Sequence, residues 1–209
     1  MLKNKNSIFF NLNCVDLCKT NFLLQMNYSF KEEGKFKYVE IGEGRPIIIL
    51  HGLMGGLSNF NGVTEFFNQN GYKVVLPELP LYSLPLLSTN VKSFAEYLKD
   101  FIDFLGFNDV ILLGNSLGGH IGLLYTKLYP AKVKALVITG SSGLYESAMG
   151  SGYTKRSDYE VMKSKVQEVF YDPEVASKEM VDEVFASVND RSKLIKTLAI
   201  AKSAIRHNM

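Results

Sequence analysis

The segment Gly114-Asn115-Ser116-Leu117-Gly118 places a serine between two glycines where two sequence patterns meet. Residues 110–113 before it form a continuous apolar run typical of a buried strand, and a helical pattern begins at Leu117. A sharp strand-to-helix turn of this kind holds its serine in a strained conformation with the hydroxyl exposed above the sheet. The pattern predicts that Ser116 is a catalytic nucleophile. The alternative is a glycine-rich turn with a capping serine.

The residues flanking Ser116 fit this prediction. We expect Gly114 and Gly118 because a Cβ there would clash with closely approaching backbone. The helix N-terminus behind Ser116 favours negative charge, which suits a developing oxyanion. The backbone N–H of Leu117 is therefore expected to be one donor of an oxyanion hole.

A second chemical element is His51-Gly52, which follows the apolar run at residues 47–50. A loop there can offer another backbone N–H to the same oxyanion, and we expect that donor to be Leu53. Gly52 is expected to support the loop. His51 could transfer protons, but the favoured interpretation is a structural histidine that ties down its own loop.

The elements that must position these residues alternate between strand and helix patterns, which predicts βαβ units, a mostly parallel sheet and helices on both faces. Buried strands are expected at residues 47–50, 110–113 and 133–139. Other strands are expected at 36–41 and 73–76. Helices are expected from Ser58 or Asn59 to Asn70, from Asn90 to Leu105 and from Leu117 to Tyr129.

Beyond Gly143 the strand signal disappears and only helical patterns remain. We expect one helix over residues 158–170, a second capped by Asp172 with Pro173 in its first turn, and a third capped by Asp190. Residues from about 145 to 209 therefore form a helical block appended to the sheet.

Composition excludes several classes of protein. The chain has 209 residues, 46% of them hydrophobic and 21% charged, with a net charge of +2 and no basic stripe of the kind that binds nucleic acid. Cys14 and Cys18 are the only cysteines, too few for a zinc site or a disulfide framework, which favours a reducing, cytoplasmic location. A membrane partner is not expected because no run of ~18 apolar residues occurs.

The first 25 residues differ from the rest of the chain. Polar residues such as Asn11, Asp16 and Lys19 interrupt any apolar core that a signal peptide would need. We expect a disordered or spurious extension over residues 1–25, with Met26 as the functional start. A degenerate targeting segment is the alternative.

The sequence resembles the α/β-hydrolase superfamily. Four segments carry the resemblance in the family's order: I-I-I-L-H-G-L-M-G-G, V-V-L-P-E-L-P, V-I-L-L-G-N-S-L-G-G-H and Y-P-A-K-V-K-A-L-V-I-T-G. The third is similar to small bacterial hydrolases that include carboxylesterases and carbon–carbon bond hydrolases. The resemblance implies a Ser-His-acid triad, no cofactor and no metal, a hydrolase core over residues 26–144 and a helical cap over 145–209. The loop at residues 79–85 departs from the family's Gly-x-Gly-x-Ser turn, which leaves one pocket wall undefined.

The resemblance also implies an acid and a histidine after further strands that this chain does not contain. His120 lies one helical turn beyond Ser116 and is expected to pack, because it cannot curl back to the serine. His207 follows no strand, and no carboxylate occurs after residue 139 until Glu146. We therefore expect the catalytic acid and histidine not to be in this chain, the last two strands to be missing, and this fragment to be inactive or impaired.

Several functions remain open at this point. The leading hypothesis is a serine hydrolase that transfers an acyl group from a small-molecule ester or related carbonyl substrate to water. A carbon–carbon bond hydrolase or a cofactor-free perhydrolase would use the same residues. A ligand-binding or signalling protein on the same fold is the alternative from another class, because fold does not fix function.

Overall fold

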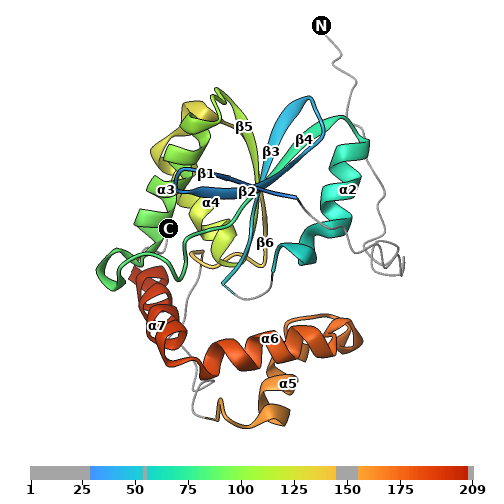
Figure 1. Cartoon of the computed structure of the whole chain (residues 1–209), viewed down its shortest axis with the longest axis vertical. Helices are drawn as coiled ribbons and strands as arrows, with labels where there is room; N and C mark the ends of the chain where they lie inside the picture. Colours follow the sequence, from blue (N-terminus) through green and yellow to red (C-terminus); the bar gives the residue numbers. More distant parts are fainter. Residues whose placement is uncertain (1–28, 54–55, 145–154, 207–209) are drawn as a thin grey trace, which may run out of the picture.

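The computed structural model describes residues 29–53, 56–144 and 155–206, and its centre is a six-stranded sheet (Figure 1). The strands are β1 (Phe30–Glu33), β2 (Phe36–Ile41), β3 (Arg45–Leu50), β4 (Tyr72–Pro77), β5 (Val110–Asn115) and β6 (Val133–Thr139). They lie in the order β1-β2-β4-β3-β5-β6. The pairs β3–β4, β3–β5 and β5–β6 are parallel, whereas β1–β2 and β2–β4 are antiparallel. This confirms the predicted mostly parallel sheet.

Helices cover both faces of the sheet, as expected. Helix α2 (Asn61–Gln69) lies on one face, and α3 (Val91–Phe104) and α4 (Leu117–Leu128) lie on the other (Figure 1). In β3, Ile48 and Leu50 belong to the apolar cluster with α3 and α4, whereas Ile47 and Ile49 belong to the cluster on the α2 face. All four side chains are fully buried. The run is therefore apolar without alternation because both of its faces are covered.

The hairpin of β1 and β2 was not predicted in full. Only β2 was expected, because β1 is a short strand of four residues that are largely polar and exposed. Gly34, with a φ of 62°, lies in the turn that joins the two strands. Strand β1 forms through its pairing with β2, for example between Phe30 and Val39, rather than through an apolar pattern of its own.

The expectation that residues 133–139 form a buried strand is wrong in its burial. Strand β6 pairs with β5 alone and is the last strand of the described sheet. Its residues alternate between half-buried and exposed, and Val137 remains 43% exposed. Strand β6 is largely apolar, but of its residues only Val133 and Leu136 are packed against the main core within the described part of the chain.

Some helices begin at capping residues and others do not. Asn90, where the predicted helix begins, caps α3, since its side-chain oxygen accepts the N–H of Ser93 at 3.0 Å. The expected cap of α2 at Ser58 or Asn59 is wrong. A 3₁₀ turn (Leu57–Phe60) comes first, and α2 begins at Asn61 without a side-chain cap bond.

The C-terminal part is helical, as predicted, with α5 (Tyr159–Gln167), α6 (Lys178–Asn189) and α7 (Arg191–Arg206). Asp158 caps α5, and the Asp190 carboxylate accepts the N–H groups of Ser192 and Lys193 at the start of α7. The prediction for Asp172 is wrong, because it caps only a short 3₁₀ turn (Pro173–Val175). Ser177 caps α6 instead. Within the described ranges, no helix combines the length and the apolar character needed to cross a bilayer.

Candidate active site

The turn between β5 and α4 holds Ser116 in an unusual backbone conformation. Its φ of 52° and ψ of −118° make it the one non-glycine residue with positive φ among those that the structure describes. The Ser116 N–H donates to the Thr139 carbonyl at 3.0 Å, and the Ser116 carbonyl accepts the N–H groups of His120 and Ser142, both at 3.2 Å. A strained residue costs roughly 1–3 kcal/mol and persists only where its surroundings fix it, as these three bonds do.

The glycines around Ser116 are there because backbone approaches backbone. A Cβ on Gly114 would lie 2.5 Å from the Gly118 carbonyl oxygen, and a Cβ on Gly118 would overlap the Leu50 carbonyl. The pattern predicted both roles. Gly119 has a similar constraint that was not predicted, since its Cβ would lie 2.6 Å from the Ser141 hydroxyl.

The loop after β3 meets this turn. A Cβ on Gly52 would lie 3.3 Å from the Ser116 Cβ, so the two segments are in contact. Leu53 follows directly and packs at the edge of the main core. Leu117 is the first residue of α4, and its N–H is among those that helix geometry leaves without an intrahelical acceptor. The two residues expected to supply N–H donors thus belong to segments that touch at Ser116.

His51 uses both ring nitrogens within its own surroundings. Its Nε2 accepts the Leu79 N–H at 2.9 Å, which places the proton on Nδ1, and Nδ1 donates to the Gly52 carbonyl at 2.8 Å. The ring is only 9% exposed, and burial lowers its pKa below 6.5, which favours the neutral form. These contacts are those of a histidine that ties its loop to the segment after β4.

His120 lies on α4 and is fully buried. Its Nδ1 lies 3.4 Å from the Ser142 hydroxyl, and Gly143 lies against its ring so closely that a Cβ would overlap it. This is the packing role expected for His120. His207 lies outside the described residues, as do Cys14 and Cys18.

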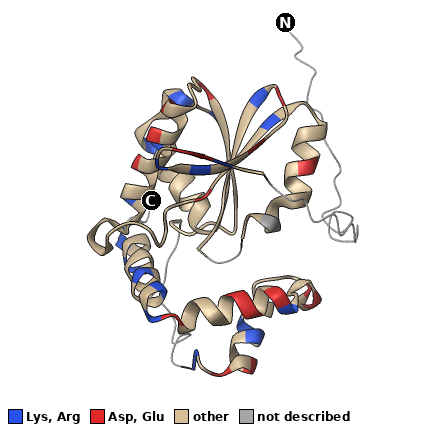
Figure 2. Cartoon of the chain, viewed as in Figure 1, with Lys and Arg blue, Asp and Glu red and all other residues tan. Residues whose placement is uncertain are grey.

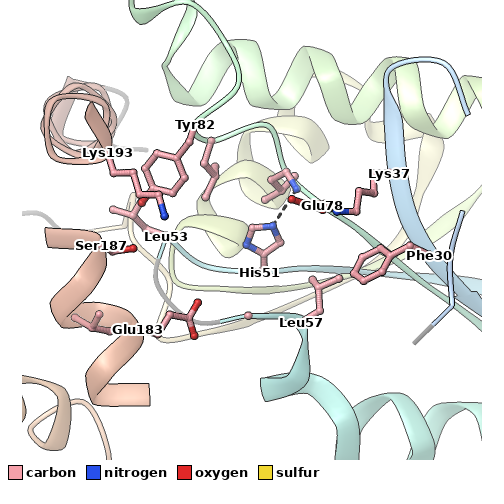
Figure 3. A pocket seen from close by; sticks show the side chains of 14 residues that line it. Phe30, Lys37, His51, Leu53, Leu57, Glu78, Tyr82, Glu183, Ser187 and Lys193 are labelled. Carbon is pink, nitrogen blue, oxygen red and sulfur yellow. Dashed lines mark hydrogen bonds and ion pairs between the residues drawn. The ribbon is translucent and has the colours of Figure 1, made fainter. Parts of the chain in front are cut away.

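A cavity of about 540 Å³ opens beside this loop (Figure 3). It lies between the sheet and helices α6 and α7, and His51 and Leu53 form part of its wall. Ser116 itself is not among the residues that line it, although it touches the adjoining Gly52. Charged side chains also line the cavity, namely Lys37, Glu78, Glu183 and Lys193.

Two of these charges neutralise one another. Lys37 Nζ lies 2.8 Å from the Glu78 carboxylate, and this hydrogen bond raises the pKa of Lys37. Lys193 and Glu183 reach the cavity from α7 and α6 respectively, and neither forms an ion pair among the described residues. The cavity therefore has polar positions as well as apolar walls.

The loop at residues 79–85 forms the wall that the sequence left undefined. The Tyr82 hydroxyl lies 3.3 Å from the Thr197 hydroxyl of α7, and Lys196 Nζ donates to the Tyr82 carbonyl. Lys193 Nζ lies 5.7 Å from the centre of the Tyr82 ring, within cation–π range. Tyr82 thus joins the sheet domain to α7. Sequence reasoning missed Tyr82, Lys193 and Glu183 because they belong to no motif.

The described residues contain no group of three or more histidine, cysteine or acidic side chains that could hold a metal ion.

Comparisons with known proteins place this geometry in a family. The family model for the alpha/beta hydrolase fold matches residues 45–180. The crystal structure of MGS-MChE2, an alpha/beta hydrolase enzyme from the metagenome of sediments of the lagoon of Mar Chica, Morocco, is 57% identical to this chain. The match covers 87% of this chain and 68% of that one, with a TM-score of 0.68.

The curated relatives include several hydrolases. A 2-hydroxy-6-oxononadienedioate/2-hydroxy-6-oxononatrienedioate hydrolase of Pseudomonas putida is 34% identical over 111 residues, which cover 49% of this chain and 39% of the relative. A 2-hydroxy-6-oxo-6-phenylhexa-2,4-dienoate hydrolase of Comamonas testosteroni is 25% identical over 182 residues, covering 78% of this chain and 63% of the relative. The chain thus spans less than two thirds of either relative. It belongs to the alpha/beta hydrolase fold family.

Proposed function

We propose that the protein is a serine hydrolase in which Ser116 is the nucleophile. The observation that carries this proposal is the conformation of Ser116, strained at φ 52° and fixed by three backbone hydrogen bonds at a strand–helix junction. A glycine-rich turn with a merely capping serine would not need this strain, and the Ser116 side chain makes no cap bond to α4. Strain of this kind clusters at functional sites.

The reaction follows from the groups around the serine. The Ser116 hydroxyl oxygen attacks a substrate carbonyl carbon, and the N–H groups of Leu53 and Leu117 stabilise the oxyanion of the tetrahedral intermediate. The leaving group departs with a proton, and water then attacks the acyl-serine to release the acid and the free serine. Gly52, Gly114 and Gly118 hold these segments at contact distance.

A general base is needed to take the serine proton, and both histidines in the described part of the chain are engaged elsewhere. His51 uses both ring nitrogens in bonds to Gly52 and Leu79, and His120 lies against Ser142 and Gly143. We propose that the base and its acid partner are contributed from outside the described residues. In their absence Ser116 retains only the weaker catalysis that an oxyanion hole and substrate binding provide.

The substrate we propose is a small carbonyl compound that enters the cavity between the sheet and the helices. Residues 26–144 would then be the hydrolase core and residues 145–209 a cap over it. An ester is the first candidate. Cleavage of a carbon–carbon bond beside a carbonyl is the second, favoured by the names of the Pseudomonas putida and Comamonas testosteroni relatives.

Labelling with a fluorophosphonate probe tests the nucleophile. We expect the native chain to be labelled slowly, Ser116→Ala not at all, and Ser142→Ala at the native rate. Ser142 is the matched control because it contacts the same turn through its backbone. Labelling that survives in Ser116→Ala, or none in the native chain under long exposure, contradicts the proposal and favours a ligand-binding protein.

Substrate class is tested separately. Hydrolysis of p-nitrophenyl acetate and of 2-hydroxy-6-oxononadienedioate is compared in the native chain and in Ser116→Ala. If Ser116→Ala loses only the hydrolysis of p-nitrophenyl acetate, the protein is an esterase. If Ser116→Ala loses the hydrolysis of 2-hydroxy-6-oxononadienedioate, the protein is a carbon–carbon bond hydrolase.

A further inference from the structure

A second depression, separate from the cavity near Ser116, lies along the outer side of α7. It has a volume of about 580 Å³ and is formed by the loop before α3, the start of α3 and one face of α7. Its apolar residues are unusually exposed for their size, since Leu87 is 96% exposed, Leu86 47% and Ile195 45%. Leu198 and Ile205 of α7, which do not line the depression, are also exposed, at 42% and 37%. Exposed apolar side chains that line one depression together are a candidate interaction site.

The charges around this surface have a single sign. Lys92, Lys202 and Arg206 line the depression, and no acidic residue does. Lys92 has an acidic neighbour, Glu96, at 3.9 Å on α3, and the other two form no ion pair among the described residues. Helix α7 as a whole carries basic residues and no acid, whereas acidic residues gather on α6 (Figure 2).

We propose that this face of the protein binds the surface of a negatively charged lipid bilayer. Leu86, Leu87 and Ile195 would enter the boundary between headgroups and acyl chains, and Lys202 and Arg206 would contact the lipid phosphates. Apolar side chains beside basic ones are typical of helices and loops that lie in a membrane interface. An interfacial surface of this kind needs no apolar run long enough to span the bilayer.

The surface is held in place before any lipid binds. The opposite side of α7 is packed into the protein, with Ile200 1% and Ala204 6% exposed. The Ser203 hydroxyl accepts the Val91 N–H at 3.1 Å, which ties α7 to the start of α3. The outer residues are thus free to contact a bilayer without unfolding the helix, and binding costs little conformational entropy.

A bilayer fits these features better than a protein partner does. Leu86 and Leu87 lie in a short 3₁₀ turn (Leu86–Ser88) rather than in a strand, so they offer no sheet edge for pairing. Anionic lipid requires only positive charge and an apolar tip, both of which are present, and it requires no matching shape. The inference does not depend on the proposed function, because none of these residues lines the cavity near Ser116.

Sedimentation with vesicles tests the proposal, using 70% phosphatidylcholine with 30% phosphatidylserine against pure phosphatidylcholine. We expect at least tenfold tighter binding to the anionic vesicles, weakened by 0.5 M NaCl. Leu87→Asp should weaken binding at least tenfold, and Lys202→Gln and Arg206→Gln about fivefold each. The matched controls are Leu128→Asp and Lys127→Gln on α4, which are also exposed and lie outside the depression. These controls should bind as the native chain does.

Three results would overturn the proposal. The first is no binding to anionic vesicles, and the second is equal binding to both vesicle types. The third is self-association in solution that Leu87→Asp abolishes while vesicle binding is absent, which would assign the surface to a second copy of the chain. Circular dichroism melting of each variant shows that a loss of binding is not a loss of folding.

Discussion

Replacing His51 with alanine separates a structural role for this residue from a catalytic one. The substitution removes the acceptor of the Leu79 N–H and the donor to the Gly52 carbonyl, both within 3 Å of the buried ring. Each buried group left without a partner costs about 1–3 kcal/mol. Two such groups give roughly 2–6 kcal/mol, and water entering from the adjoining cavity places the expected loss of unfolding free energy in the lower half of this range, at about 3 kcal/mol.

Urea unfolding of the native chain, His51→Ala and His51→Gln measures this loss. Glutamine can still accept the Leu79 N–H, so His51→Gln should lie between the other two. Fluorophosphonate labelling of Ser116 should slow in His51→Ala in proportion to the displacement of the loop. If His51→Ala unfolds at the native midpoint and labelling is nevertheless abolished, then His51 transfers protons and the structural assignment is wrong.

The same variant has a pH signature. Burial lowers the folded-state pKa of His51 below 6.5, so the unfolded chain binds the proton more readily than the folded one. Native stability is therefore lost as pH falls below 6.5 toward the lower folded-state pKa, by up to ~1.4 kcal/mol per pH unit. The stability difference between native and His51→Ala should shrink over this range. A difference that grows as pH falls would contradict the assignment of a neutral, buried imidazole.

Four further substitutions test the packing of the site and its surroundings. Gly118→Ala should lower the free energy of unfolding by at least about 1–3 kcal/mol and abolish labelling, because its Cβ would meet backbone atoms. Gly62→Ala, which lies in open space on α2, should instead raise the free energy of unfolding by about 0.5–1 kcal/mol. Equal melting temperatures of the two variants would contradict this. Tyr82→Phe removes the bond to Thr197 and should raise the KM for an ester more than it lowers kcat, with a change confined to kcat arguing against a wall role. Asn90→Ala should lower the free energy of unfolding by about 1 kcal/mol through loss of the α3 cap, and an unchanged urea midpoint would show that the cap contributes nothing.

The parts of the fold that could be predicted from sequence are those with a local cause. The apolar run of β3, the start of the helix at Asn90 and the turn at Ser116 depend on neighbouring residues, and all three occur where the sequence indicates. Strand β1 could not be predicted, because it forms by pairing with β2. The burial of β6 was also wrongly predicted. An apolar sequence indicates that a strand can be buried, but it does not indicate which segment covers the strand.

The site shows the same division. Gly114 and Gly118 were predictable because the spacing of the motif fixes their role. The two bonds of His51 were not, since its partner Leu79 is 28 residues away. Tyr82 gave only an indirect signal, as part of a loop that departs from the family pattern. Its contacts with Thr197 and Lys193 join segments more than a hundred residues apart in the chain, which no local pattern records.

The central claim is that Ser116 is the nucleophile, and mass spectrometry of an acyl-enzyme tests it most directly. The chain is mixed with an excess of p-nitrophenyl acetate, quenched in acid and digested. We predict an added acetyl group on the peptide that contains Ser116, absent when Ser116→Ala is treated in the same way. An acetyl group on another residue, or ester turnover by Ser116→Ala at the native rate, would contradict the account.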